Sequence, residues 1–104
     1  MRVLVLFDLP TTDKLQRKNA AAFRKILLND GFLMLQKSVY VRYCNNRDAA
    51  TKHIKRVKKH IPPDGKVLLQ VLTDEQFANM KRYENGNVAK MPDIRYAEHG
   101  IEVY

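Results

Sequence analysis

The chain has 104 residues, which is the length of one small domain with a single hydrophobic core. Its 19 Lys and Arg residues exceed its 11 Asp and Glu residues, and the formal net charge of +8 makes nucleic acid the leading class of partner. The single cysteine, Cys44, excludes an intrachain disulfide and favours a buried strand residue in a reducing compartment. The apolar N-terminal run is too short to cross a bilayer, so we expect a cytoplasmic protein with no membrane partner.

The charge divides the chain into two parts. Residues 1–72 carry 15 basic and 5 acidic side chains, a net charge of +10, whereas residues 73–104 carry 4 basic and 6 acidic side chains, a net charge of −2. We therefore predict a basic core domain over residues 1–72 and a C-terminal extension over residues 73–104 that contacts a second copy or another partner.

The first predicted element is a strand over residues 2–8. It is short, rich in Val and Leu, and followed closely by Pro10, as is typical of a strand buried on both faces in the middle of a sheet. The run of apolar residues ends at Asp8. The local interpretation of Asp8 is an Asx-turn or a cap, and the functional interpretation is a ligand for a hard metal ion such as Mg²⁺.

A helix is predicted next, from the N-cap residues 11–13 to about Asn29. One face of this helix is apolar and is expected to pack. The other face is basic, and taken alone it is interpreted as solvated surface; together with a second basic helix on the same face of the sheet it favours phosphate binding. The apolar positions are Leu15, Ala22, Phe23, Ile26 and Leu27, and the basic positions are Lys14, Arg17, Lys18, Arg24 and Lys25.

Two strands joined by a tight turn are predicted over residues 32–36 and 38–44, followed by a second helix up to Pro62. In that helix Ala50, Ile54, Val57 and Ile61 have the spacing of a core-facing stripe. Basic residues also lie off this stripe, namely Lys52, Lys55, Arg56 and Lys59. Residues 66–72 complete the pattern as a fourth strand.

The order strand, helix, strand, strand, helix, strand predicts an α+β protein with the ferredoxin-like βαββαβ fold, in which both helices cover one face of an antiparallel sheet. The first and third strands are expected to be central. In the extension we predict a helical turn or short helix within residues 74–83, a loop over residues 84–93 and a short strand over residues 100–104.

The remaining candidate residues give weaker signals. His53 and His60 are two helical turns apart and His99 is in the extension, so no zinc site is expected, and solvated or phosphate-contacting histidines are the simpler interpretation. Ser38 lacks the flanking glycines of a nucleophile elbow.

Arg42, on the third strand, could contact nucleic acid. An RNA-recognition motif has the same strand order, but "SVYVRYC" lacks its Gly-containing aromatic signature, so a general RNA-binding module is only a minor alternative.

Three stretches together resemble a known family. They are "LFDLP" at the end of the first strand, "KLQRKNAAAFRKIL" in the first helix, and "GFLMLQKSVYVR" with its glutamine-serine-valine pattern. This combination resembles the small CRISPR-associated adaptation proteins described as endoribonucleases, which accompany the CRISPR integrase during spacer acquisition. The resemblance covers nearly the whole chain. Many members carry Tyr before the Asp, where this chain has Phe7.

The resemblance implies a homodimer in which the two copies of Asp8 bind Mg²⁺ or Mn²⁺ between them, with Asp8 as catalytic residue and metal ligand and with no organic cofactor. It implies a metal-dependent endonuclease that hydrolyses RNA or DNA phosphodiester bonds. The alternative is a non-catalytic scaffold that holds double-stranded DNA and bridges integrase dimers, and one chain could do both. Beside double-stranded DNA, single-stranded RNA is a second candidate partner, and the natural substrate is either DNA or RNA. Of the matching positions, Arg17 lies in the family's basic first-helix region.

Overall fold

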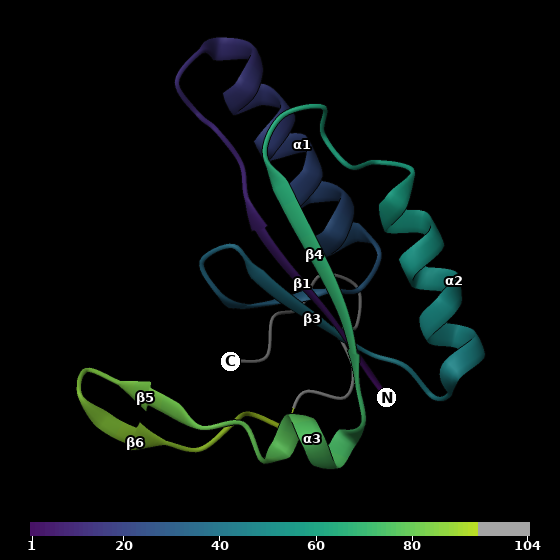
Figure 1. Cartoon of the computed structure of the whole chain (residues 1–104), viewed down its shortest axis with the longest axis vertical. Helices are drawn as coiled ribbons and strands as arrows, with labels where there is room; N and C mark the ends of the chain where they lie inside the picture. Colours follow the sequence, from purple (N-terminus) through teal and green to yellow (C-terminus); the bar gives the residue numbers. More distant parts are fainter. Residues whose placement is uncertain (94–104) are drawn as a thin grey trace.

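The computed structural model describes residues 1–93, which form a four-stranded antiparallel sheet, two long helices and a small C-terminal arm (Figure 1). The expected short strand over residues 100–104 lies outside the described residues. The elements are β1 (Arg2–Asp8), α1 (Lys14–Asn29), β2 (Leu33–Gln36), β3 (Val39–Tyr43), α2 (Arg47–Lys58), β4 (Lys66–Leu72), α3 (Asp74–Ala78), β5 (Arg82–Glu84) and β6 (Asn87–Ala89).

The strands of the main sheet are ordered β2-β3-β1-β4, so β1 and β3 are central, as predicted. Every pairing is antiparallel, and β1 is in register with β4 along its whole length, from Arg2 opposite Leu72 to Asp8 opposite Lys66. The α+β class and the ferredoxin-like βαββαβ order are thus confirmed.

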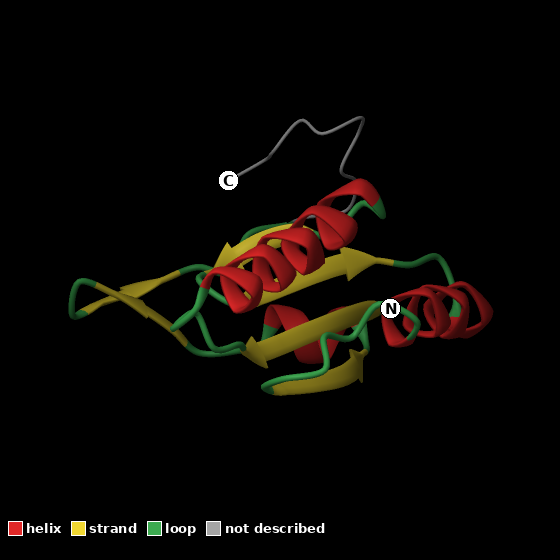
Figure 2. Cartoon of the chain, turned by 90° about the horizontal axis from the view of Figure 1, so that it is seen from above, coloured by secondary structure: helices red, strands yellow, loops and turns green. Residues whose placement is uncertain are grey.

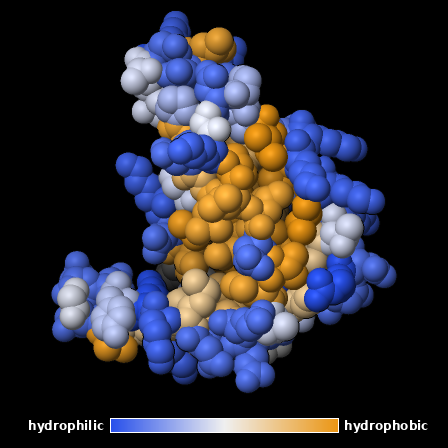
Figure 3. Space-filling view, viewed as in Figure 1, coloured by the Kyte–Doolittle hydropathy of each residue, from blue (hydrophilic) through white to orange (hydrophobic). Residues whose placement is uncertain are grey.

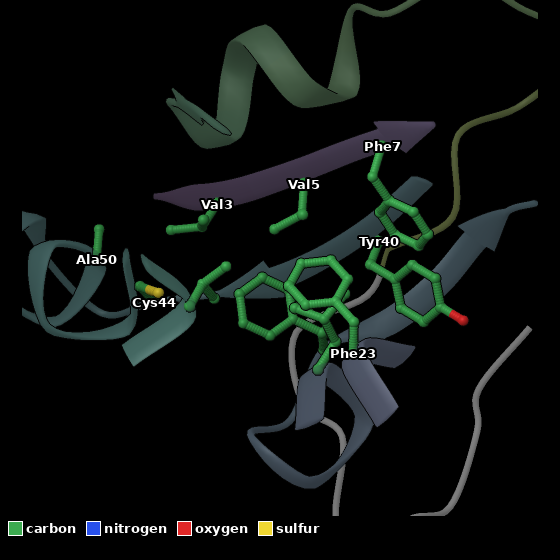
Figure 4. Packing of buried hydrophobic residues seen from close by; sticks show 10 residues of the cluster. Val3, Val5, Phe7, Phe23, Tyr40, Cys44 and Ala50 are labelled. Atoms are coloured by element: carbon green, nitrogen blue, oxygen red, sulfur yellow. The ribbon is translucent and has the colours of Figure 1, made fainter. Parts of the chain in front are cut away.

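One face of the sheet is covered by α1 and α2, and the main core lies between the sheet and these helices. Val3, Val5 and Phe7 alternate along β1 and point to this side, where Phe7 and Tyr40 stack with ring centroids 5.6 Å apart (Figure 4). Phe23 packs edge-on against Phe7 at 5.2 Å. Cys44 is buried in the same core, as its sequence context predicts.

The start of α1 is set by a capping box. The Asp13 side chain accepts a hydrogen bond from the backbone N–H of Gln16, and the Gln16 side chain accepts one from the backbone N–H of Asp13. Leu15, predicted to face the core, is instead 65% exposed, and Ala22 is exposed as well. Leu15 is in the first turn of α1, which lies beyond the strand ends (Figure 1), whereas Ala22 is in the middle of the helix but off its buried side, which is formed by Ala20, Phe23 and Leu27.

The opposite face of the sheet, which we call the open face, carries Leu4 and Leu6 of β1 together with Leu33 and Val41. Of the helices in residues 1–93, α3 packs against it through Phe77, which is 1% exposed, and Met91 adds a further apolar contact. Much of the remaining surface is apolar and uncovered by the described residues, and a continuous hydrophobic area extends over the middle of the molecule (Figure 3).

Arg2 holds α3 at one end of the open face. Its guanidinium lies 4.7 Å from the centroid of the Phe77 ring and 5.2 Å from that of Tyr43, and its Nε donates to Asp74 at 3.3 Å. The amino group of Met1 also bonds to Asp74, at 2.8 Å. Asp74 begins α3, whose existence the sequence predicted.

The predicted loop over residues 84–93 is wrong in its first half, since β5 and β6 form a hairpin there. Asn85 and Gly86 both have positive φ angles, 53° and 81°, which is the geometry of a type I′ turn. The hairpin projects from the body of the molecule in both views (Figure 1, Figure 2).

Within residues 1–93, none of the helices has the length and apolar composition needed to span a lipid bilayer.

Candidate metal and nucleic-acid site

Asp8 is the last residue of the central strand β1, and its side chain is exposed. Side chains alternate between the faces of a strand, so Asp8 lies on the open face together with Leu4 and Leu6. The sheet therefore presents one carboxylate rigidly at the edge of an apolar surface, in agreement with the strand-end position expected from the sequence.

The backbone behind Asp8 is held by a close approach of Gly65. A Cβ atom on Gly65 would lie 2.6 Å from the carbonyl oxygen of Asp8 and 2.9 Å from a methyl carbon of Leu9. Gly65 also has a φ angle of +95°, which L side chains rarely adopt. Glycine at this position allows β4 to begin directly against the end of β1.

Lys66 is the cross-strand neighbour of Asp8, a residue that the sequence did not single out. The two residues are directly paired in the antiparallel register, so both side chains lie on the open face. Both are exposed, and no ion pair within 4.0 Å joins them. The pairing of β1 with β4 brings the Lys66 cation next to Asp8. Because the two residues are far apart in the sequence, no sequence motif indicates this proximity.

Asp8 alone is a weak metal site within one chain. Among residues 1–93, no three His, Cys, Asp or Glu side chains come together as a ligand set. Mg²⁺, however, keeps several waters and is commonly held by one or two carboxylates together with substrate phosphates. An exposed carboxylate on a rigid strand fits that requirement when a second copy of Asp8 or a phosphate completes it.

The basic residues of α1 are placed as the sequence predicts, on the side of the helix that faces away from the sheet. All five are exposed, whereas Ala20, Phe23 and Leu27 on the opposite side are buried. Arg17 also donates two hydrogen bonds to the backbone carbonyl oxygens of Thr11 and Thr12, which hold its guanidinium at the start of the helix. The five residues are Lys14, Arg17, Lys18, Arg24 and Lys25.

Arg42 differs from these five because it is partly buried. Its Nε donates to the backbone carbonyl of Asp30 at 2.8 Å, and another guanidinium nitrogen donates to that of Tyr43 at 2.6 Å. These bonds tie β3 to the end of α1 and give Arg42 a structural role. Its contact with nucleic acid stays a prediction.

The expectation that His53 is solvated or contacts phosphate is wrong. His53 is 8% exposed, and its Nδ1 lies 2.8 Å from the Asp30 carboxylate. Arg56 donates to the other oxygen of the same carboxylate at 2.9 Å. This cluster joins the end of α1 to the middle of α2, so Arg56 is partly neutralised, while Lys52, Lys55 and Lys59 extend the exposed basic surface.

Two groups elsewhere have shifted pKa values. Burial raises the pKa of the Cys44 thiol, which makes it a poor nucleophile at neutral pH. Hydrogen bonds from the Met1 amino group and from Arg2 lower the pKa of Asp74, although partial desolvation opposes them. Both groups are structural and lie away from Asp8.

Two further residues, Phe7 and Ser38, lie in the sequence stretches on which the resemblance to a known family rests, and the structure shows their contacts. Phe7 is buried in the aromatic core, so its ring does the packing that a Tyr ring would do. Ser38 has a φ angle of 63° in the turn between β2 and β3, and its carbonyl oxygen accepts a hydrogen bond from the backbone N–H of Phe7 at 3.0 Å. Ser38 thus supports the end of β1 through its backbone.

Comparison with known proteins gives a consistent result. The family described as "CRISPR associated protein Cas2" matches residues 1–80. A protein from Acidovorax ebreus is 48% identical over 81 residues, covering 78% of this chain and 79% of its own. A protein from Flavobacterium psychrophilum is 46% identical over 81 residues, covering 78% and 70% respectively. Both are named "CRISPR-associated endoribonuclease Cas2", and the present chain belongs to the Cas2 family.

Proposed function

We propose that this chain is a CRISPR-associated endonuclease that acts as a homodimer and uses Mg²⁺ or Mn²⁺ to hydrolyse phosphodiester bonds, with RNA as the first candidate substrate. The observation that carries the proposal is the exposed carboxylate of Asp8 at the end of the central strand, on the open face. The names of the relatives, which are endoribonucleases, support the reaction class.

Dimerisation is supported by the apolar character of the open face. Leu68 of β4 is 67% exposed there, beside the partly buried Leu6, and a small domain gains stability by burying such a surface against a second copy. Two-fold symmetry would bring the same patch of both chains together. Asp8 lies on this patch, so each chain would contribute one carboxylate to a shared site.

Each residue then has a defined task. The two Asp8 carboxylates would hold the cation, and the backbone contacts of Gly65 and Ser38 fix the end of β1 that carries them. When bound, the cation supplies polarisation of the scissile phosphate and activation of a water for attack at phosphorus. The exposed cations of α1 would bind neighbouring phosphates of the substrate.

A second function is favoured by a separate observation, the basic outer surface of α1 and α2. Within its helical span α1 contains five basic residues and no acidic residue. Such a surface binds phosphate backbones with little sequence preference, as a scaffold for double-stranded DNA requires. We therefore propose that the dimer also serves in spacer acquisition, where it would bridge CRISPR integrase subunits with or without use of the metal site.

The substitution Asp8→Asn separates the two functions. It is nearly isosteric and removes the charge that attracts the cation, so Mg²⁺-dependent cleavage of RNA and DNA should fall to the level measured in EDTA. Duplex binding and the dimer should stay close to wild type. Asp48→Asn is the matched control, since it removes an exposed carboxylate at the start of α2 and should keep full cleavage.

Full cleavage by rigorously purified Asp8→Asn protein would refute the nuclease proposal. Loss of the dimer in the same variant would favour the local interpretation of Asp8 as a capping residue. Reconstituted spacer integration gives the readout for the scaffold, and it should persist in Asp8→Asn if that function is independent of the cation.

A further inference from the structure

We infer that Lys66 is the phosphate-binding residue of the Asp8 site, which supplies the positive charge that positions the substrate backbone against the carboxylate. This inference rests on the proposed function, because it assumes that a phosphodiester is bound at Asp8. It assigns a role to a residue that sequence motifs leave unmarked.

The first support is the register of the sheet. Asp8 and Lys66 are direct partners across the β1–β4 ladder, and directly opposed residues have Cβ atoms about 5 Å apart. Gly65 lies against the carbonyl oxygen of Asp8, and β4 begins at the next residue, Lys66. This contact fixes Lys66 opposite Asp8. Both side chains therefore project from adjacent, rigid positions toward the same side.

The second support is the chemical state of Lys66. Its side chain is exposed, and in the part of the chain that the structure describes its ammonium forms no hydrogen bond or ion pair. The other residues on its side of β4 are Leu68, Gln70 and Leu72, so Lys66 is the single cation on this side of the strand. The ammonium group of Lys66 has three N–H donors and can therefore bind the oxygen atoms of a phosphate group.

A competing role is that Lys66 simply neutralises Asp8. That role and the phosphate role differ in what they predict when Asp8 carries no charge. If Lys66 served only as a counter-ion to Asp8, its removal would tighten cation binding and would weaken binding of nucleic acid only while Asp8 keeps its charge. If it binds phosphate, its removal weakens binding of nucleic acid whether or not Asp8 carries a charge.

The experiment measures the affinity of the full-length protein for a fluorescent DNA duplex of arbitrary sequence, in EDTA and over a range of salt concentrations. For Lys66→Met we expect the Kd to rise about tenfold, and the log–log salt slope to become shallower by about 0.9 per lost phosphate contact. Lys66→Arg keeps the charge and should restore most of the affinity. Lys66→Gln, which is polar, repeats the test if the Met variant aggregates.

Lys81→Met is the matched control, because Lys81 is also exposed but follows α3, near the Arg2 end of the sheet. It removes the same charge and should change the Kd less than twofold. If both variants raised the Kd equally, the change would result from the net charge of the protein and not from the position of Lys66, and the inference would be overturned.

The double variant Asp8→Asn/Lys66→Met isolates the local role. Relative to Asp8→Asn alone, it should lose the same factor of about ten in duplex affinity. No loss in the Asp8→Asn background would show that Lys66 acts only through Asp8 and would overturn the inference. Because these measurements require no cleavage, failure of the nuclease proposal in Asp8→Asn remains distinguishable from failure of the Lys66 assignment.

Discussion

The two faces of the sheet bury similar strand residues but meet different surroundings. On one face, α1 and α2 cover Val3, Val5 and Phe7, and their outer surfaces are rich in exposed Lys and Arg. On the other face, among the described residues, α3 and Met91 cover part of an apolar surface that ends at Asp8. The comparison teaches that one small sheet can separate two kinds of surface, since the covered side displays the positive charge that the proposed phosphate binding needs, while the open face displays the apolar surface that the proposed self-association needs.

The largest effect on stability is expected from a substitution in the core between the sheet and the helices α1 and α2. Phe23 and Phe77 are equally buried, at 1% exposure, but belong to the two opposite clusters. Phe23→Ala should lower the free energy of unfolding by about 3–5 kcal/mol, measured by urea denaturation. Phe77→Ala should cost less in the monomer, because only the short α3 depends on it. The reverse order would show that the open-face cluster is the main core.

Neutralising the outside of α1 should affect binding and leave the fold intact. We expect the variant with Arg17, Lys18, Arg24 and Lys25 all changed to Gln to bind duplexes of unrelated sequence about 100-fold more weakly, and with a flatter salt slope. These side chains are exposed, so the melting temperature should change little. An unchanged slope would place the phosphate-binding surface elsewhere on the chain.

A charge placed on the open face should abolish the dimer. Leu68→Glu would bury a carboxylate in an apolar interface, and sedimentation should detect monomer at concentrations where the wild type is dimeric. Leu15→Glu is a close control, since Leu15 is 65% exposed against 67% for Leu68 but belongs to α1. Equal dissociation by both variants would contradict the assignment of the open face as the interface.

The smallest effect concerns the link between α3 and the sheet. The pKa of Asp74 is lowered in the fold, so its ionised form stabilises the protein at neutral pH, and this contribution is lost as the pH falls through the acid range of a carboxyl group. Asp74→Asn should lower the melting temperature at pH 7 by about 2 °C or less, because Asp74 is half exposed. The difference should vanish at low pH. Glu75→Gln, on the same helical turn, should show no such pH dependence.

The sequence predicted those features that depend on local patterns. The four strands, both long helices and the burial of Cys44 follow from periodicity, caps and breakers. The hairpin of β5 and β6 was missed although "NG" at residues 85–86 is a strong turn signal, because the flanking strands have only three residues each.

The missed side-chain roles depend on contacts between distant parts of the chain. His53 lies on the buried side of α2, and its partner Asp30 comes from the end of α1, 23 positions earlier. Lys66 lies beside Asp8 only through the pairing of β1 with β4, and Arg42 is occupied by backbone carbonyls that no motif predicts. Periodicity gives the face of a residue on its own element, but the partner across the sheet depends on the register.

The six-residue spacing between Arg2 and Asp8 has a consequence for how β1 can change. Because side chains alternate along a strand, this even spacing places the residue that anchors α3 and the residue that ends the strand on the same side. Insertion of one residue between them would turn Asp8 into the aromatic core, or Arg2 away from α3. Insertion of two residues would restore both orientations while lengthening the strand by about 7 Å. A single insertion would keep both orientations only by forming a β-bulge, an irregularity of the kind found in β2 between Met34 and Gln36.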